Sequence, residues 1–252
     1  MTNLKNGTVA RGASAGSRLR FLVLCLLTLL LLSCQQKADT PEAIVKKVIA
    51  AHGGAEKLRA VNGYLYLGQI QAAMADDQGK VWILYREPEQ LRVIIRMTEG
   101  KEERLLLGDE GWRDNGRGFV KVDGPALAVM AFQAEHIDLP RHLVEKRYKV
   151  KKAEIQNEEK GETLILTDAD GVETVVVVDP VRSVIRTVER EFDIAGQTVR
   201  MGVAYEDYRD VKGVQLPFRL LNFVNGQLVG RTDYQSVQIN PPLPERVFER
   251  PE

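Results

Sequence analysis

A glycine-rich segment near the start of the chain has the residue types of a nucleophilic site. Gly12-Ala13-Ser14-Ala15-Gly16 matches the G-x-S-x-G pattern, in which a strained turn between a strand and a helix exposes a reactive serine. That chemistry needs a strand before the turn and a helix after it. Here the segment precedes a short apolar run instead, so the pattern does not indicate a hydrolase.

An acidic segment later in the chain has the spacing with which a calcium-binding loop begins. Asp168-Ala169-Asp170-Gly171 provides the first carboxylates, but such a loop also needs a glutamate at position 12 and flanking helices. Position 12 is Asp179, and the flanking runs have the pattern of strands. A hairpin turn explains the segment better, because Asp-Gly tolerates the positive φ that such turns require.

The three histidines are the remaining residues that could do chemistry. His136 and His142 lie six residues apart with Glu135 and Asp138 nearby, a wider spacing than the i, i+4 pair that holds zinc on a helix. We interpret them as the polar edge of a helix. His52 falls in the last turn of another predicted helix, where a cation interacts favourably with the helix dipole. We therefore predict no catalytic residue and no metal ligand.

An apolar run, Phe21–Leu32, ends abruptly at Ser33-Cys34. The run has 12 residues, whereas a helix that spans a bilayer needs about 20. A basic segment, a short apolar segment and a small residue at the break are typical of a secretory signal peptide, here residues 1–33. The basic residues before the run are Lys5, Arg11, Arg18 and Arg20.

The four residues at the break, Leu31-Leu32-Ser33-Cys34, resemble the lipobox of bacterial lipoproteins. The resemblance implies cleavage between Ser33 and Cys34, a diacylglycerol group on the cysteine thiol, and an N-acyl chain such as palmitate on its new amino group. The alternative is an ordinary signal peptide with an incidental cysteine. Lipidation would anchor the chain to a membrane, because each buried methylene contributes about 0.8 kcal/mol. Residues 34–40 would then form a lipidated tether.

The composition narrows the classes of function. The residues from Cys34 onward carry a net charge of about −4, which gives no reason to expect nucleic acid binding. Cys25 lies in the apolar run and Cys34 would carry the lipid, so no thiol is left for catalysis or for a disulfide. We predict no cofactor besides the covalent lipid. The length suits a single domain over residues 41–252.

Two helices are predicted in this domain. Thr40-Pro41-Glu42 is a typical helix start, and it is followed by an apolar stripe at helical spacing that stops at Gly53-Gly54. A second helix covers residues 124–145, with Pro140 ending or kinking it.

The rest of the domain alternates strand-like runs with turns such as Asn225-Gly226. We predict a mainly β (α+β) fold, a single curved antiparallel sheet covered by two or so helices. The predicted strands cover residues 64–73, 80–87, 90–98, 102–107, 111–113, 148–156, 163–167, 173–179, 183–192, 198–205, 214–224 and 227–239.

This order of elements resembles the LolA/LolB-like superfamily, which includes outer-membrane lipoprotein-sorting proteins. The stretches that carry the resemblance are AIVKKVIAAHGGAEKLRAVNGYLYLGQI, GDEGWRDNGRGFVKVDGPAL, YEDYRDVKGVQLPFRLLNFVNGQL and VQINPPLPERVFERP. The resemblance implies an incomplete, strongly curved β-barrel whose helices cover an apolar cavity that accommodates acyl chains. Gln35 follows Cys34 where retained inner-membrane lipoproteins commonly have Asp, which favours the outer membrane, on its periplasmic side.

Apolar residues on the predicted strands are candidates for the wall of that cavity, although the same residues could be ordinary core. They are Trp82, Leu84, Val93, Ile95, Met97, Leu105, Leu107 and Trp112. We therefore expect a non-catalytic, membrane-anchored lipoprotein that binds an acylated or other apolar ligand, with a role in lipoprotein or lipid trafficking. The alternative is a scaffold or accessory subunit of an envelope complex, with a filled cavity and a protein partner.

Overall fold

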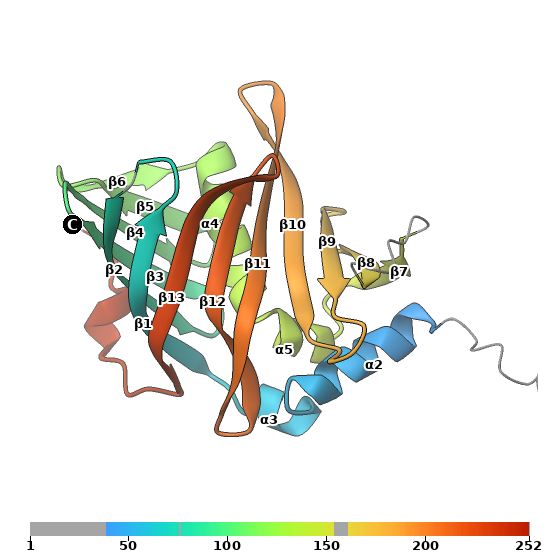
Figure 1. The fold of residues 1–252 in the computed structure, drawn as a ribbon. Helices are drawn as coiled ribbons and strands as arrows, with labels where there is room; N and C mark the ends of the chain where they lie inside the picture. Colours follow the sequence, from blue (N-terminus) through green and yellow to red (C-terminus); the bar gives the residue numbers. More distant parts are fainter. Residues whose placement is uncertain (1–38, 76, 154–160, 252) are drawn as a thin grey trace, which may run out of the picture. The chain divides into compact units, whose positions relative to one another are not determined.

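The computed structural model describes residues 39–75, 77–153 and 161–251 (Figure 1). The predicted signal peptide, its cleavage site at Ser33-Cys34, the lipidation site and the Ser14 motif lie outside the described residues. Residues Thr40–Glu252 form one compact unit. Within the described part of the chain, no helix combines the length and the apolar character that crossing a bilayer would require.

The helices begin and end where the local sequence favours it. The Thr40 hydroxyl accepts a 3.2 Å hydrogen bond from the Ala43 amide and so caps α2. Pro140 is the second residue of α5, and the predicted break in the long helix is confirmed. The helices are α2 (Pro41–Ala51), α3 (Ala55–Arg59), α4 (Gly124–Ile137), α5 (Leu139–Val144) and a 3₁₀ turn, η1 (Glu245–Phe248).

The strands form a 13-stranded antiparallel sheet in the order β6-β5-β4-β3-β2-β1-β13-β12-β11-β10-β9-β8-β7. The strands are β1 (Gly63–Ala72), β2 (Asp77–Arg86), β3 (Gln90–Met97), β4 (Lys101–Leu107), β5 (Glu110–Asp114), β6 (Phe119–Val122), β7 (Lys149–Lys152), β8 (Glu162–Thr167), β9 (Glu173–Val178), β10 (Ile185–Ile194), β11 (Gln197–Val211), β12 (Val214–Val224) and β13 (Gln227–Ile239).

This topology confirms the predicted meander. Consecutive strands pair along the whole chain except for β6 and β7. At the centre of the sheet β1 pairs with β13, which joins the half formed by β1–β6 to the half formed by β7–β13. The edge strands β6 and β7 do not pair, so the sheet stays open. Two predictions needed correction: β6 was missing, because residues 119–122 follow a glycine-rich segment, and β11 continues to Val211 beyond the predicted end at Tyr205.

The sheet curves around helices α4 and α5, which lie behind it in the view of Figure 1. Alternation along β2 shows how the core forms: Val81, Ile83 and Tyr85 are buried, whereas the side chains between them face the opposite side. The main core fills the concave side of the sheet, where α2 and α3 pack against α5. Burial of this apolar surface is the principal force that holds the helices on the sheet.

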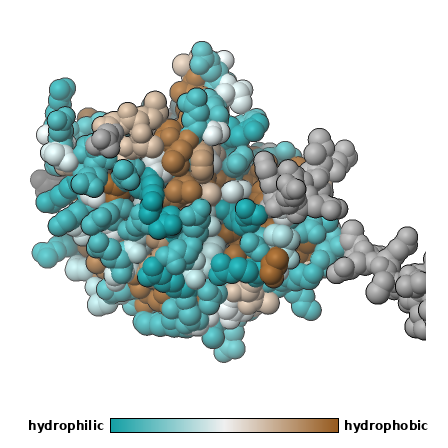
Figure 2. All heavy atoms as spheres, in the orientation of Figure 1, coloured by the Kyte–Doolittle hydropathy of each residue, from teal (hydrophilic) through white to brown (hydrophobic). Residues whose placement is uncertain are grey.

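A smaller apolar cluster lies on the other side of the sheet, beneath the C-terminal segment. Phe248 is 5% exposed and packs with Leu105 and Trp112, and the Arg86 guanidinium lies 4.7 Å from the centre of its ring. We call this group the C-terminal cluster; it consists of Leu84, Leu105, Leu107, Trp112, Phe119, Leu243, Val247 and Phe248. The rest of the face seen in Figure 2 is largely hydrophilic, with hydrophobic residues in separate groups.

Candidate ligand cavity

A cavity of about 320 Å³, here called the wide cavity, lies between α4 and the concave side of the sheet. Both halves of the sheet contribute to its wall. The lining residues are Ile70, Val81, Ile83, Val93, Ile95, Arg104, Val129, Phe132, Gln133, His136, Ile137, Met201, Gly202, Val203, Leu220, Asn222, Phe223, Val224, Val229, Gly230, Thr232 and Tyr234.

The alternation along the strands and the helical spacing along α4 explain which side chains form this wall. Val81 and Ile83 on β2, like Val93 and Ile95 on β3, are two residues apart and therefore face the same side of the sheet. On α4 the lining side chains recur at helical spacing, so a single face of the helix is directed into the cavity. They are Val129, Phe132, Gln133, His136 and Ile137.

The wide cavity has one charged residue in its wall. The Arg104 Nε lies 2.7 Å from Glu102 Oε1, and its Nη1 donates a 2.9 Å hydrogen bond to Gln133 Oε1. The charge is therefore compensated by a carboxylate two residues away on the same strand, β4, and its Nη1 hydrogen bond is directed at α4. The rest of the wall is predominantly aliphatic and aromatic, which suits an apolar ligand.

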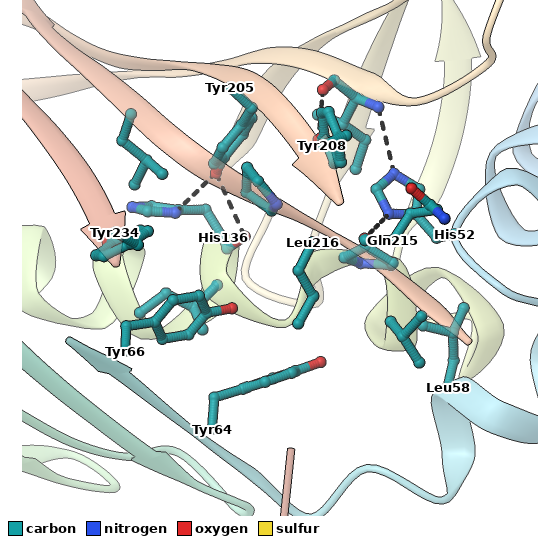
Figure 3. A pocket seen from close by; sticks show the side chains of 16 residues that line it. His52, Leu58, Tyr64, Tyr66, His136, Tyr205, Tyr208, Gln215, Leu216 and Tyr234 are labelled. Atoms are coloured by element: carbon teal, nitrogen blue, oxygen red, sulfur yellow. Dashed lines mark hydrogen bonds between the residues drawn. The ribbon is translucent and has the colours of Figure 1, made fainter. Parts of the chain in front are cut away.

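A smaller space of about 30 Å³ adjoins the wide cavity, and we call it the tyrosine chamber (Figure 3). Four residues line both spaces: His136, Ile137, Leu220 and Tyr234. The complete lining of the chamber is His52, Leu58, Tyr64, Tyr66, His136, Ile137, Pro140, Ile185, Tyr205, Tyr208, Val214, Gln215, Leu216, Pro217, Leu220 and Tyr234.

His52 lies at one end of this chamber and is 2% exposed. Its Nδ1 is 3.1 Å from the Gln215 carbonyl oxygen, and its Nε2 accepts a 3.3 Å hydrogen bond from the Ile185 amide. Only a neutral ring with the proton on Nδ1 satisfies both contacts. Burial lowers the pKa of His52 to about 4, although the bond to Gln215 opposes this. The predicted role as a cation at a helix end is therefore wrong, because the helix end is buried against the sheet.

His136 lies between the two spaces and is also neutral at neutral pH. Its Nδ1 is 2.8 Å from the Tyr205 hydroxyl. Burial, together with the nearby positive charge of Arg190, lowers the pKa of His136 to about 4. Burial likewise raises the pKa values of Tyr66 and Tyr205 well above the usual range, so both hydroxyls stay protonated. The chamber is polar but uncharged.

The eight residues predicted to line a cavity lie in different parts of the fold. Val93 and Ile95 line the wide cavity, and Met97 packs at the edge of the main core. Trp82 faces the other side of the sheet, where the Arg96 guanidinium lies 5.8 Å from its ring. The remaining four belong to the C-terminal cluster and do not line the wide cavity; they are Leu84, Leu105, Leu107 and Trp112.

The tyrosines of the chamber were missed by sequence reasoning. Tyr64 and Tyr66 are two residues apart on one strand, and that spacing could have indicated a shared face. Tyr205 and Tyr208 carried no such signal, because they are three residues apart on β11. Asp207 between them has a φ of +53°, which interrupts the alternation and lets both rings line the chamber.

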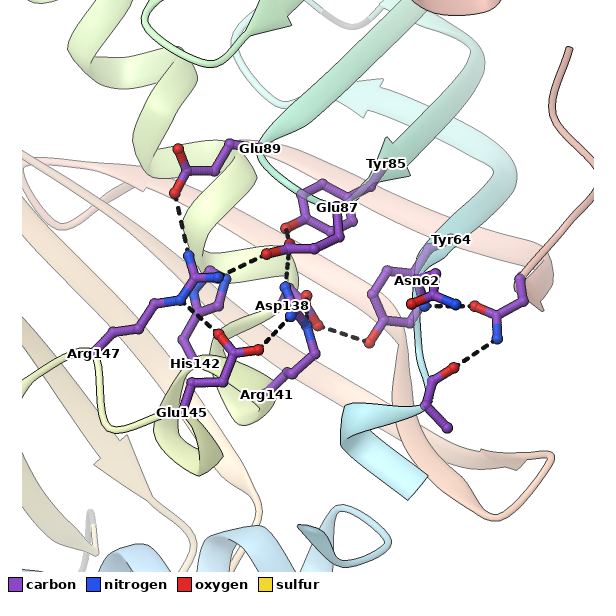
Figure 4. Close-up of polar contacts among 12 residues, drawn as sticks. Asn62, Tyr64, Tyr85, Glu87, Glu89, Asp138, Arg141, His142, Glu145 and Arg147 are labelled. Carbon is purple, nitrogen blue, oxygen red and sulfur yellow. Dashed lines mark hydrogen bonds and ion pairs between the residues drawn. The ribbon is translucent and has the colours of Figure 1, made fainter. Parts of the chain in front are cut away.

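Glu87, Asp138 and His142 come within reach of one another, as the ligands of a metal ion would (Figure 4). Arg141 lies among them, with its Nε 2.5 Å from Asp138 Oδ2 and its Nη2 paired with Glu87. Burial opposes ionisation of Glu87, but hydrogen bonds from Arg141 and Tyr85 outweigh it and lower the pKa of Glu87 to about 2. A guanidinium already compensates these carboxylates, which favours a structural role.

The two histidines considered as zinc ligands, His136 and His142, contact different residues. His136 contacts Tyr205 on β11, whereas His142 Nδ1 lies 3.3 Å from the Tyr148 hydroxyl. Asp168 forms the predicted hairpin turn between β8 and β9, where its Oδ1 accepts hydrogen bonds from the Asp170 amide at 3.0 Å and the Val172 amide at 2.8 Å.

Comparison with known proteins identifies the fold. No protein-family model and no curated protein matches the chain. Among solved structures, a LolA superfamily protein from Nitrosomonas europaea is 16% identical, with a TM-score of 0.54 over 84% of this chain and 99% of that chain. A DUF1329 family protein from Desulfovibrio piger is 9% identical, with a TM-score of 0.54 over 84% and 98%. The chain therefore has a LolA-like fold, as the sequence resemblance predicted.

Proposed function

We propose that the protein is a membrane-anchored lipoprotein that binds an acylated or other apolar ligand in the wide cavity. The observation that carries this proposal is the cavity itself, enclosed by α4 and both halves of the sheet and lined mainly by apolar side chains. Its volume of about 320 Å³ is at the lower end of the range found for small-molecule sites. We infer no catalytic role, since no nucleophile or metal set is assembled among the described residues that line it.

The energetics favour an alkyl chain as the ligand. Each methylene moved from water to an apolar site contributes about 0.8 kcal/mol, so ten methylenes contribute about 8 kcal/mol before the cost of association. That cost amounts to at least about 4 kcal/mol. The net gain for ten carbons is therefore at most about 4 kcal/mol, a dissociation constant of about 1 mM, and each further methylene should tighten binding.

The length of chain between Cys34 and the compact unit fits a function at a membrane. The unit begins at Thr40, and the six residues from Gln35 to Thr40 reach about 20 Å when extended. A lipid on Cys34 would therefore keep the cavity close to a supply of acyl chains. We propose the periplasmic side of the outer membrane as the location, and lipoprotein or lipid trafficking as the process.

Uptake of an uncharged fluorescent lipid with a long alkyl chain by the chain from Gln35 onward tests ligand binding. The proposal predicts saturable binding that an unlabelled neutral lipid of the same chain length reverses. Absence of uptake would contradict it and would favour the scaffold alternative. Depletion of the protein from cells tests the trafficking role separately: lipoproteins should accumulate away from their normal membrane, and a normal distribution would refute that role.

A further inference from the structure

Two tyrosine hydroxyls in the tyrosine chamber have no hydrogen-bond partner among the described residues. They belong to Tyr66, which is 4% exposed, and Tyr234, which is 5% exposed. The centres of the two rings lie 4.8 Å apart. In Figure 3 the Tyr66 hydroxyl points into the space between Tyr64, His136 and Leu216. Both residues line the chamber, so each hydroxyl is free to bind a polar group that enters it.

The other hydroxyls of the chamber are already engaged. Tyr64 donates a 3.0 Å hydrogen bond to Asp138 Oδ1, and Tyr208 donates a 2.6 Å hydrogen bond to the Ile185 carbonyl. Tyr205 contacts His136. The rings of Tyr66 and Tyr234 belong to the main core, but their hydroxyls take no part in the hydrogen bonds of the chamber and have the capacity to bind a ligand.

The charge of the chamber restricts what can bind there. None of its sixteen lining residues is Asp, Glu, Lys or Arg. Both histidines in its wall, His52 and His136, are neutral at neutral pH. An ionised group placed in the chamber would lose its hydration without meeting an opposite charge, which is strongly unfavourable. A neutral group that donates or accepts one or two hydrogen bonds incurs no such penalty.

Resting on the proposed function, we infer that the tyrosine chamber binds the neutral polar end of an amphiphile whose apolar chain lies in the wide cavity. The polar end is a hydroxyl or a carbonyl oxygen, held by the hydroxyls of Tyr66 and Tyr234. The chamber's volume of about 30 Å³ leaves room for a small polar group. The preferred ligands are therefore long-chain alcohols, aldehydes, ketones or esters, and not ionised fatty acids.

Competition among matched ten-carbon probes tests this inference. Displacement of a bound fluorescent acyl reporter from the chain from Gln35 onward is measured with 1-decanol, decane and decanoate at pH 7.5. We expect 1-decanol to compete at a concentration about tenfold lower than decanoate does. Equal competition by all three probes, or the strongest competition by decanoate, would overturn the inference and leave apolar ligand binding intact. Failure of the reporter itself to bind would instead overturn the proposed function.

Substitution of two tyrosines tests whether the preference for 1-decanol arises in the tyrosine chamber. Tyr66→Phe and Tyr234→Phe each remove one hydroxyl that has no hydrogen bond to the protein. Each substitution should weaken competition by 1-decanol about fivefold while leaving competition by decane unchanged. Tyr208→Phe is the matched control, because its hydroxyl is bound to Ile185 and should not affect the preference for the alcohol. A preference that persists in both Tyr66→Phe and Tyr234→Phe would show that a bound water, and not the ligand, satisfies these hydroxyls.

Discussion

The Nδ1 atom of His52 lies 3.1 Å from the carbonyl oxygen of Gln215, although 163 residues separate them in the chain. The contact joins the end of α2 to β12, and the Ile185 amide adds a bond from β10 to the other ring nitrogen. Protonation of the ring would replace the acceptor at Nε2 with a donor facing the Ile185 amide. The hydrogen bond from the Ile185 amide therefore exists only while His52 is neutral, whereas the backbone bond from the Gln215 amide to the His52 carbonyl does not depend on pH.

This arrangement predicts a loss of stability in mild acid. The pKa is lowered to about 4 for His52 and His136 and to about 3 for His142, against about 6.5 in an unfolded chain. The unfolded chain therefore binds protons that the folded chain does not. The free energy of unfolding should stay constant above pH 6.5 and fall as the pH drops from 6.5 towards 4, by about 3 kcal/mol for His52 alone. Urea unfolding at successive pH values measures this fall.

His52→Gln is the control for this pH dependence. The variant should be less stable than the parent at pH 7, and the difference should shrink as the pH falls, because glutamine does not titrate. A constant difference would exclude His52 as a source of the pH dependence. Asp138, whose pKa burial raises to about 6, works in the opposite direction and reduces the total change.

Removal of the Arg141 guanidinium should destabilise the fold strongly. Arg141 is 5% exposed and pairs with Glu87, Asp138 and Glu145. Arg141→Met leaves the buried carboxylate of Asp138 without its cation and leaves Glu87 paired only with Arg147, which should cost about 3–5 kcal/mol in urea unfolding. Arg200→Met provides the comparison, since its pair with Glu191 is exposed and should contribute less than about 1 kcal/mol. Similar losses in the two variants would contradict the structural role assigned to this cluster.

The C-terminal segment should be an integral part of the fold. Phe248→Ala empties the centre of the C-terminal cluster and should lower the free energy of unfolding by about 3 kcal/mol. Val181→Ala, at a position that is 89% exposed, should change it by less than about 0.5 kcal/mol. A Phe248→Ala variant as stable as the parent would mean that the segment is not bound to the sheet.

Neighbouring residues on β3 distinguish the two sides of the sheet. Val93 lines the wide cavity, whereas Ile94 pairs with Trp82 on the opposite side. Val93→Phe should reduce uptake of a fluorescent fatty acid at least tenfold, because the larger ring occupies space that the ligand needs. Ile94→Phe adds similar bulk outside the cavity and should leave uptake unchanged. Equal effects of the two substitutions would place the binding site elsewhere.

The turns were the most predictable part of the fold. Asn225 and Gly226 both have positive φ values, +50° and +78°, as a two-residue hairpin requires, and the strands on either side pair as predicted. Local chemistry determines such turns, and the turns determine which strands become neighbours. The curved antiparallel sheet therefore followed from the sequence with little ambiguity.

The candidate site was less predictable, because it depends on which side of the sheet faces the helices. Alternation showed that Trp82 and Ile83 face opposite sides of the sheet, but local patterning could not identify the side that α4 covers. The C-terminal cluster added a second apolar surface, so Trp112 is buried without lining the wide cavity. Tyr208 lines the chamber together with Tyr205 because the positive φ of Asp207 interrupts the alternation between them.

The central claim is that the wide cavity holds an apolar ligand, and native mass spectrometry tests it most directly. The chain from Gln35 onward is purified without detergent, sprayed under native conditions and then extracted with organic solvent. We predict a reproducible mass increment that disappears on denaturation, with a neutral long-chain lipid in the extract. A protein with only its own mass, which also takes up neither added fatty acid nor added long-chain alcohol, would contradict the claim.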